Sequence, residues 1–129
     1  MGWPMHSVAN AALRIVDSIT ELTAQDAGCI AVSGSHGGIS SARYALVAQP
    51  LLSVFNDAGV GKNQAGIAAL VWLESHGLAA CTVAHTSACI GDARSTREHG
   101  VVSHTNTLAR ALGIELGMPC SAIGLKHPA

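Results

Sequence analysis

Three segments of the chain combine glycines with side chains that transfer protons, attack carbonyl groups or hold anions. Their members are Ser35, His36, Gly37, Gly38, Asp57, Gly59, Gly61, Lys62, His85, Ser87, Cys89, Asp92 and Arg94. Each segment follows a short apolar run that predicts a buried strand. If these strands are parallel, the three segments meet at one edge of the sheet, where open α/β folds bind their ligands.

Histidine, aspartate, serine and cysteine act as general acids and bases or as nucleophiles. We expect His85 and Asp57 to be acid–base groups, Ser35 or Cys89 to be the nucleophile, and His36 to belong to the same catalytic set. Ser35 and His36 are adjacent, so their side chains diverge in an extended segment. A base for Ser35 would therefore come from His85. The residues around Ser35 do not match the G-x-S-x-G motif.

His36, Asp57 and His85 also suit a divalent metal with open coordination positions. They follow different strands, so their spacing does not separate metal binding from metal-free catalysis. A structural role, with Asp57 capping the next helix, is equally compatible with the pattern. We assign no metal ligands and expect no organic cofactor, and the 3% aromatic content argues against a flavin site.

Gly59, Gly61 and Lys62 precede a predicted helix and present backbone N–H groups and a cation at a strand end. This arrangement binds a carboxylate or a phosphate. The alternative is a tight turn with a solvated lysine. A P-loop is excluded, because Asn56 and Asn63 occupy positions at which that motif requires Gly and Ser or Thr.

The first and third segments supply the other candidate substrate-binding groups. Gly37 and Gly38 allow a ligand to approach the backbone closely. Ser87, Asp92 and Arg94 lie in a loop of about ten residues, and loops of that length in small domains are often functional. Arg94 suits bidentate binding of a substrate carboxylate, whereas a surface pair with Asp92 is the structural alternative.

The spacing of apolar residues predicts an alternation of helices and strands. Helices are predicted at 5–22, 40–48, 63–75 and 95–112, and strands at 28–32, 51–55, 78–84 and 119–125. The last helix is expected to begin at a capping box formed by Ser95 and Glu98. It is unusually polar at His99, Ser103, His104 and Asn106. His104 would face the site, a subunit contact or the core.

This alternation predicts one α/β domain over residues 1–129. The expected architecture has three layers, α/β/α, with a mostly parallel sheet of about four strands, Rossmann-like or flavodoxin-like. Cys29, Cys81 and Cys120 fall in predicted buried strands, where free cysteine behaves as a small hydrophobic residue.

The composition restricts the partners. Hydrophobic residues make up 49% and charged residues 12%, which favours a homo-oligomer with surface buried between copies. A net charge of −1 and few aromatic residues argue against nucleic-acid binding. No apolar run approaches the roughly 20 residues that cross a bilayer. The first residues also lack a signal-peptide pattern, so we expect no membrane contact and a cytoplasmic location.

These observations predict a small cytoplasmic enzyme acting at the C-terminal edge of the sheet. It would be a hydrolase or a lyase/isomerase, and its substrate a small, anionic, carboxylate- or amide-bearing metabolite. The alternative is a non-catalytic regulatory subunit that binds a small anion or a nucleotide within a larger assembly.

Overall fold

A computed structural model describes residues 8–124 of the chain. Within this range five strands form one sheet in the order β1-β2-β3-β4-β5. The strands β1 (Leu13–Val16), β2 (Ile30–His36), β3 (Leu52–Asn56) and β4 (Ala79–Val83) are parallel, and β5 (Val102–Thr105) is antiparallel to β4. The predicted α/β class with a mostly parallel sheet is confirmed.

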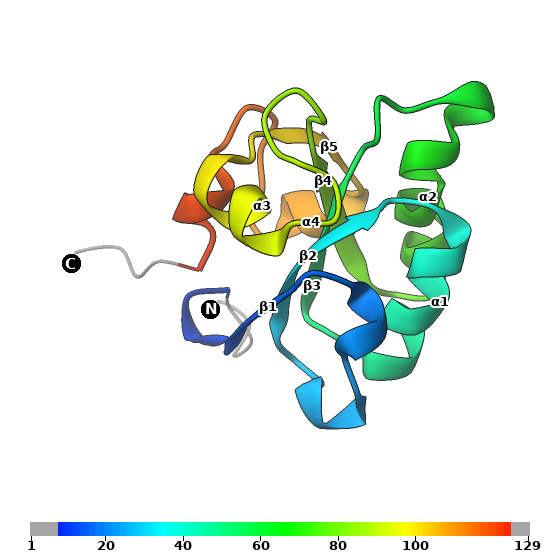
Figure 1. Cartoon of the computed structure of the whole chain (residues 1–129). Helices are drawn as coiled ribbons and strands as arrows, with labels where there is room; N and C mark the ends of the chain where they lie inside the picture. The colour runs from blue at the N-terminus through cyan, green and yellow to red at the C-terminus, as the bar shows by residue number, and fades with distance from the viewer. Residues whose placement is uncertain (1–7, 125–129) are drawn as a thin grey trace.

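Helices cover both faces of this sheet. The α-helices are α1 (Ile39–Ala48), α2 (Ala68–Ser75), α3 (Ala93–His99) and α4 (Thr107–Ala111). The 3₁₀ helices are η1 (Val8–Asn10), η2 (Ile19–Glu21), η3 (Ala24–Asp26), η4 (Lys62–Ile67) and η5 (Cys120–Ala122). Figure 1 shows α1 and α2 on one side of the sheet and α3 and α4 on the other, which gives three layers.

The strand order explains why α1 and α2 share a side. Each parallel strand lies next to the strand before it in sequence, so the crossovers through α1 and α2 step in the same direction. Right-handed crossovers that step in one direction cover the same face. The order has no reversal among its parallel strands, whereas Rossmann and flavodoxin folds bind ligands at such a reversal. The finer prediction of a Rossmann-like or flavodoxin-like fold is therefore not confirmed.

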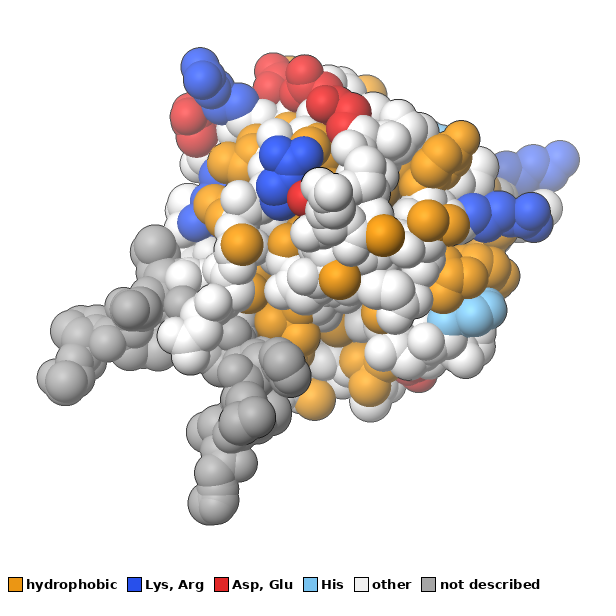
Figure 2. Space-filling view, turned by 90° about the horizontal axis from the view of Figure 1, so that it is seen from below, with side chains coloured by type: hydrophobic (Ala, Val, Ile, Leu, Met, Phe, Trp, Pro, Cys, Tyr) orange, Lys and Arg blue, Asp and Glu red, His pale blue; other side chains and the backbone are white. Residues whose placement is uncertain are grey.

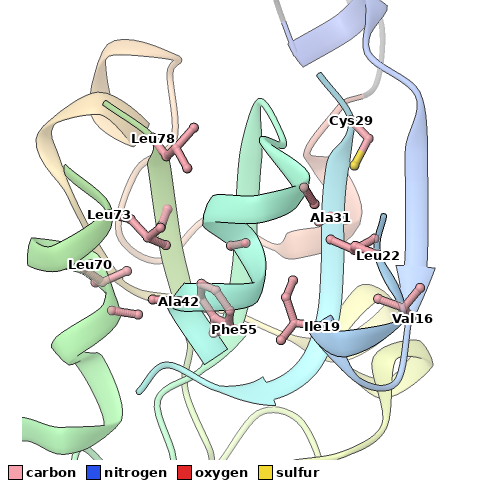
Figure 3. Close-up of a cluster of buried hydrophobic side chains, with 14 residues drawn as sticks. Val16, Ile19, Leu22, Cys29, Ala31, Ala42, Phe55, Leu70, Leu73 and Leu78 are labelled. Carbon is pink, nitrogen blue, oxygen red and sulfur yellow. The ribbon is translucent and has the colours of Figure 1, made fainter. Parts of the chain in front are cut away.

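Side chains of the central strands alternate between two cores. Ala31, Phe55 and Ala80 face α1 and α2, where they pack with Ala42 and Leu73, as Figure 3 shows for most of them. The second core, on the face of α4 and η5, contains Ile30, Val32, Leu52, Val54, Cys81, Val83, Val102, Ala109, Cys120 and Ile123. Burial on both faces accounts for the unbroken apolar runs of these strands.

The helix predicted at 5–22 is wrong where the structure describes it. Residues 13–16 form β1, which pairs with β2 from Leu13 opposite Ile30 to Val16 opposite Ser33. Ser18 then starts η2 with a capping box completed by Glu21. The β-branched residues of the segment suit a strand at the sheet edge, and β-ladder hydrogen bonds replace the helical ones. Residues 5–7 lie outside the described range.

The helix predicted at 95–112 is also wrong, because two helices and a strand occupy it. The N-cap of α3 is Asp92, not Ser95, and its carboxylate accepts a hydrogen bond from Ser95 N. The chain leaves α3 at Gly100, whose added Cβ would lie 2.4 Å from the Thr96 carbonyl oxygen. Asn106 caps α4 after β5. The strand predicted at 119–125 is replaced over its described part by η5, with one isolated bridge from Pro119 to Val101.

Away from the strand ends that carry the predicted site, the surface is mixed. Figure 2 shows the molecule from below relative to Figure 1. On this face hydrophobic side chains are scattered among polar ones, and charged side chains lie mainly toward the rim. Over residues 8–124, no helix combines the length and the apolar character needed to span a membrane.

Candidate functional site

The carboxyl ends of β2, β3 and β4 carry the candidate site. His36 ends β2 and lies in register with Asn56 at the end of β3, which in turn pairs with Val83 at the end of β4. Asp57 and His85 follow directly on from β3 and β4. In Figure 1 the segments after β3 and β4 extend from the upper end of the sheet. The predicted meeting of these segments at one edge is confirmed by this register.

Asp57 is the buried centre of the site. Its side chain is 6% exposed, and Oδ1 accepts hydrogen bonds from the backbone N–H groups of Gly59 at 2.8 Å and His85 at 3.1 Å. The ring Nδ1 of His85 lies 3.3 Å from the same oxygen. The Nδ1 of His104, from β5, lies 3.9 Å from Oδ2. One carboxylate therefore lies close to two histidines, one in the loop after β4 and one on β5.

The surroundings of Asp57 favour its charged form. Burial opposes ionisation, but hydrogen bonds from Gly59 N–H, the Ser103 hydroxyl and His85 outweigh it and hold the pKa of Asp57 below its ordinary value. The Asp57 side chain is therefore a carboxylate at neutral pH. A carboxylate only accepts hydrogen bonds, so Asp57 favours the form of His85 that carries a ring proton on Nδ1, 3.3 Å from Oδ1.

Two hydroxyl groups connect the second histidine to the sheet. Thr82 Oγ1, on β4, lies 2.9 Å from Ser103 Oγ on β5 and 3.4 Å from Nδ1 of His104. Ser103 Oγ is 3.2 Å from the same nitrogen. Thr82 and Ser103 were not among the predicted site residues. The polar run from Ser103 to Asn106 was the available signal, and its meaning depended on recognising a strand there.

The loop after Asp57 has an unusual backbone. Positive φ angles occur at Ala58 (53°), Val60 (68°), Asn63 (57°) and Gln64 (61°), as well as at Gly59 and Gly61. A β-branched residue in this region is a conformational outlier. Gly66 closes the loop, because its N–H donates to the Val60 carbonyl at 2.7 Å. Strained backbone of this kind is concentrated at functional sites.

Two cavities lie on either side of this loop. The first, of about 580 Å³, is lined by His85, Ala58, Ser87, Cys89 and His99, among others. The second, of about 450 Å³ and mostly apolar, is lined by His36, Gly38, Ile39, Ala58, Val60, Gly61, Ala65, Gly66 and Ala68. Ala58 borders both cavities. Each predicted catalytic histidine therefore lines a space of metabolite size.

Several predicted site residues have structural contacts. Ser35 Oγ accepts a hydrogen bond from Ile19 N at 2.9 Å. Ser87 Oγ donates a hydrogen bond to the Ala84 carbonyl and accepts one from Val101 N. It therefore holds the loop after β4 against the start of β5. The nucleophilic role of Ser35 and the substrate contact of Ser87 remain predictions.

Of the predicted charged groups, Asp92 caps a helix, whereas Lys62 and Arg94 are exposed at the surface. Asp92 caps α3, and the Arg94 side chain is 84% exposed and lies 4.0 Å from Glu98. Lys62 is exposed at the start of η4. None of the three lines either cavity among residues 8–124.

The glycines of the predicted site have distinct roles. A Cβ at Gly37 would lie 2.4 Å from the Gly66 carbonyl oxygen, so this position serves close packing of two loops. Gly59 and Gly61 have positive φ angles of 76° and 74°, and Gly59 lies beneath the His85 ring. Gly38 precedes α1 and donates its N–H to His36.

A metal centre is not supported by the arrangement of side chains. In the part of the chain that the structure describes, no group of three His, Cys, Asp or Glu side chains is placed to hold one ion.

The sequence and the structure were compared with known proteins. Neither the protein-family models, nor the curated proteins, nor the solved structures gave a match.

Proposed function

We propose that the protein is a small enzyme that catalyses acid–base chemistry on a small carboxylate- or amide-bearing metabolite. The observation that carries the proposal is the buried carboxylate of Asp57, 3.3 Å from Nδ1 of His85, with His85 lining a cavity of about 580 Å³. Carboxylate–histidine pairs of this kind set the tautomer of the ring and stabilise its protonated form. General acid–base groups contribute about 10²–10⁴-fold to rate.

In this mechanism His85 is the proton-transferring group and Asp57 is its positioning residue. The Asp57 carboxylate holds the proton on Nδ1, so Nε2 of His85 has a lone pair that takes a proton from substrate or water. The His85 side chain is 56% exposed, which leaves the ring accessible to a ligand. The positive charge that develops on the ring is balanced by the carboxylate.

The reaction class is a hydrolysis or a lyase/isomerase proton transfer. Cys89 is exposed and lines the same cavity as His85, which makes it the candidate nucleophile for the hydrolytic route. In the lyase/isomerase route His85 removes a proton from carbon and no nucleophile is required. No step in either route requires a metal or an organic cofactor.

The cellular setting belongs to the same proposal. The four cysteines are free thiols, as in proteins of reducing compartments such as the cytoplasm.

The partners follow from the surface. Val47 on α1 and Val71 on α2 are 70% and 77% exposed, and Leu13 and Ile15 are exposed on the edge strand β1. Apolar surface of this kind supports a homo-oligomer. The low net charge argues against a nucleic-acid or membrane partner.

The test incubates the protein with small carboxylates and amides in D₂O and detects their turnover by ¹H NMR. Asp57→Asn and His85→Gln should each lower turnover of the identified compound by about 10²-fold or more. His76→Gln is the matched control, because His76 lies at the end of α2 beside Trp72 and should leave turnover unchanged. Folded Asp57 and His85 variants with full activity would contradict the proposal.

The same experiment distinguishes the non-catalytic alternative. A binding subunit would show saturable thermal stabilisation by a compound that is recovered unchanged. An enzyme would convert that compound, or exchange its protons with solvent.

A further inference from the structure

A third cavity, of about 420 Å³, lies beside the edge strand β5. Among residues 8–124 it shares no lining residue with the cavity of His85, and the proposed acid–base chemistry does not use it. Its two walls differ in character. The wall from η4 and α2 presents apolar side chains such as Ile67 and Val71, whereas the wall from β5 and α4 presents His104 and Arg110.

The buried amide of Asn106 holds these two walls together. Its Nδ2 donates hydrogen bonds to the carbonyl oxygens of Leu70, on α2, and Leu78, at 3.1 and 3.0 Å. Its Oδ1 accepts one from Ala109 N, on α4, at 2.9 Å. Because the walls are joined before a ligand arrives, binding costs less conformational entropy than it would in a cavity that has to form.

Glu74 and Arg110 line the cavity with opposite charges, and both are bonded to Thr107. Oε1 of Glu74 accepts a hydrogen bond from Thr107 N, and Nη2 of Arg110 donates one of 3.1 Å to Thr107 Oγ1. This shared partner keeps the carboxylate and the guanidinium within about 10 Å of each other. Over residues 8–124, however, neither side chain forms an ion pair. Their charges are therefore available to a molecule that carries both signs.

The guanidinium of Arg110 is already oriented by the protein. Its Nη1 donates hydrogen bonds to the carbonyl oxygen and the hydroxyl of Thr105, at 3.2 and 3.1 Å. Arginine has five N–H donors, so two remain beyond the bonds to Thr105 and Thr107. A carboxylate is the acceptor that matches two N–H groups of one guanidinium.

We propose that this cavity binds an α-amino acid with a short aliphatic side chain. Its carboxylate contacts Arg110, its ammonium group contacts Glu74, and its side chain packs on Ile67 and Val71. Val71 is 77% exposed, so a ligand there removes apolar surface from water. The proposal does not depend on the proposed function, because it requires neither Asp57 nor His85.

Both charges of the ligand are needed in this arrangement. A carboxylic acid without an amino group would bring its anion close to Glu74 with no compensating contact, and an amine would do the same with its cation at Arg110. Both protein groups are solvent-exposed, so each contact is of modest strength and we expect millimolar affinity for the amino acid.

The first test titrates the full-length ¹⁵N-labelled protein with L-leucine and records two-dimensional ¹H–¹⁵N spectra. Signals of residues 67–74 and 104–110 should shift and saturate. The same titration with 4-methylpentanoate, which is leucine without its amino group, should give a Kd about fivefold higher. 3-Methylbutylamine, which is leucine without its carboxylate, should bind about fivefold more weakly as well.

The second test removes each protein charge in turn. Glu74→Gln keeps an oxygen acceptor for Thr107 N and should weaken leucine binding about fivefold, without weakening that of 4-methylpentanoate. Arg110→Gln should weaken binding of both compounds. Arg94→Gln and Glu98→Gln are the matched controls, because this exposed pair lies on α3 and neither residue lines the cavity, so both variants should bind leucine like wild type. Thermal unfolding checks that each variant is folded.

The outcomes separate this inference from the proposed function. Saturable shifts at both walls, with leucine preferred over both analogues, support the inference. Equal affinity for leucine and 4-methylpentanoate in wild type overturns it, and so does the absence of saturation. Shifts at residues 85–89 in place of 104–110 overturn it as well, since the ligand would then lie in the cavity of His85. None of these results changes the turnover expected of the Asp57–His85 pair.

Discussion

Asp57→Asn is the substitution that tests the electrostatics of the site most directly. Two backbone N–H groups donate to the Asp57 carboxylate, at 2.8 and 3.1 Å. A hydrogen bond to a charged group contributes about 1.5–3 kcal/mol and a neutral one about 1 kcal/mol. The amide keeps one oxygen acceptor, so the difference over two bonds predicts a loss of about 2 kcal/mol in the free energy of unfolding at pH 7.

The pH dependence of this loss follows from the lowered pKa of Asp57. The stability contributed by the charged form is present above the unfolded-state pKa of about 3.9 and is lost as the pH falls through the lower folded-state pKa. The difference between wild type and Asp57→Asn should therefore shrink as the pH falls below about 4. Urea unfolding monitored by tryptophan fluorescence measures it.

Asp92→Asn provides the control for this experiment. Asp92 accepts a hydrogen bond from Ser95 N at 3.0 Å as the N-cap of α3. Asparagine caps helices as well as aspartate does, so this variant should stay within about 0.5 kcal/mol of wild type. A difference between wild type and Asp57→Asn that does not change down to pH 3, or an Asp57→Asn variant more stable than wild type, would refute the reasoning.

Four further predictions concern the loops and the core. Gly66→Ala should destabilise by about 3 kcal/mol or more in urea unfolding, because its Cβ would lie 2.0 Å from the Asp57 carbonyl oxygen. Val60→Gly should stabilise by about 1 kcal/mol in the same assay, since φ at Val60 is 68°, and destabilisation would contradict this. Asn106→Ala should cost at least about 3 kcal/mol, because the buried amide bonds backbone groups of three segments, and a loss below 1 kcal/mol would contradict it. In a thiol-reagent titration of native protein, Cys89 alone should react quickly, whereas rapid reaction of two thiols would be inconsistent with the fold. The slow thiols should be those whose pKa is raised by burial, namely Cys29, Cys81 and Cys120.

The central half of the fold was predictable because burial on both faces leaves a strong sequence signal. The strands predicted at 28–32, 51–55 and 78–84 overlap β2, β3 and β4, and the helix predicted at 40–48 corresponds to α1. The edge strands β1 and β5 were missed. Their residues alternate less clearly, and apolar positions in both segments also fit a helical period, so local pattern alone did not separate the two structures.

The site was predictable in its location but not in its internal connections. Asp57 and His85 follow recognisable strands, so their meeting could be expected from parallel topology. The proximity of Asp57 to Ser103 and His104 could not be expected, because it depends on β5, which runs antiparallel to β4. The hydrogen bond from Gly38 N–H to Nδ1 of His36 could not be predicted either, because residue spacing carries no information about a single backbone contact.

The sequential strand order has a consequence for how the chain matures. Each strand of the sheet pairs with the strand made just before it, so the sheet can grow from its N-terminal side by short loop closures as the chain emerges from the ribosome. Asp57 and His85 can meet once β4 has been added, whereas His104 arrives only with β5, the final strand of the described sheet. Asp57 is therefore synthesised first and His104 last of these three residues. In a nascent chain arrested before residue 104, Asp57 has His85 as a neighbour but not yet His104.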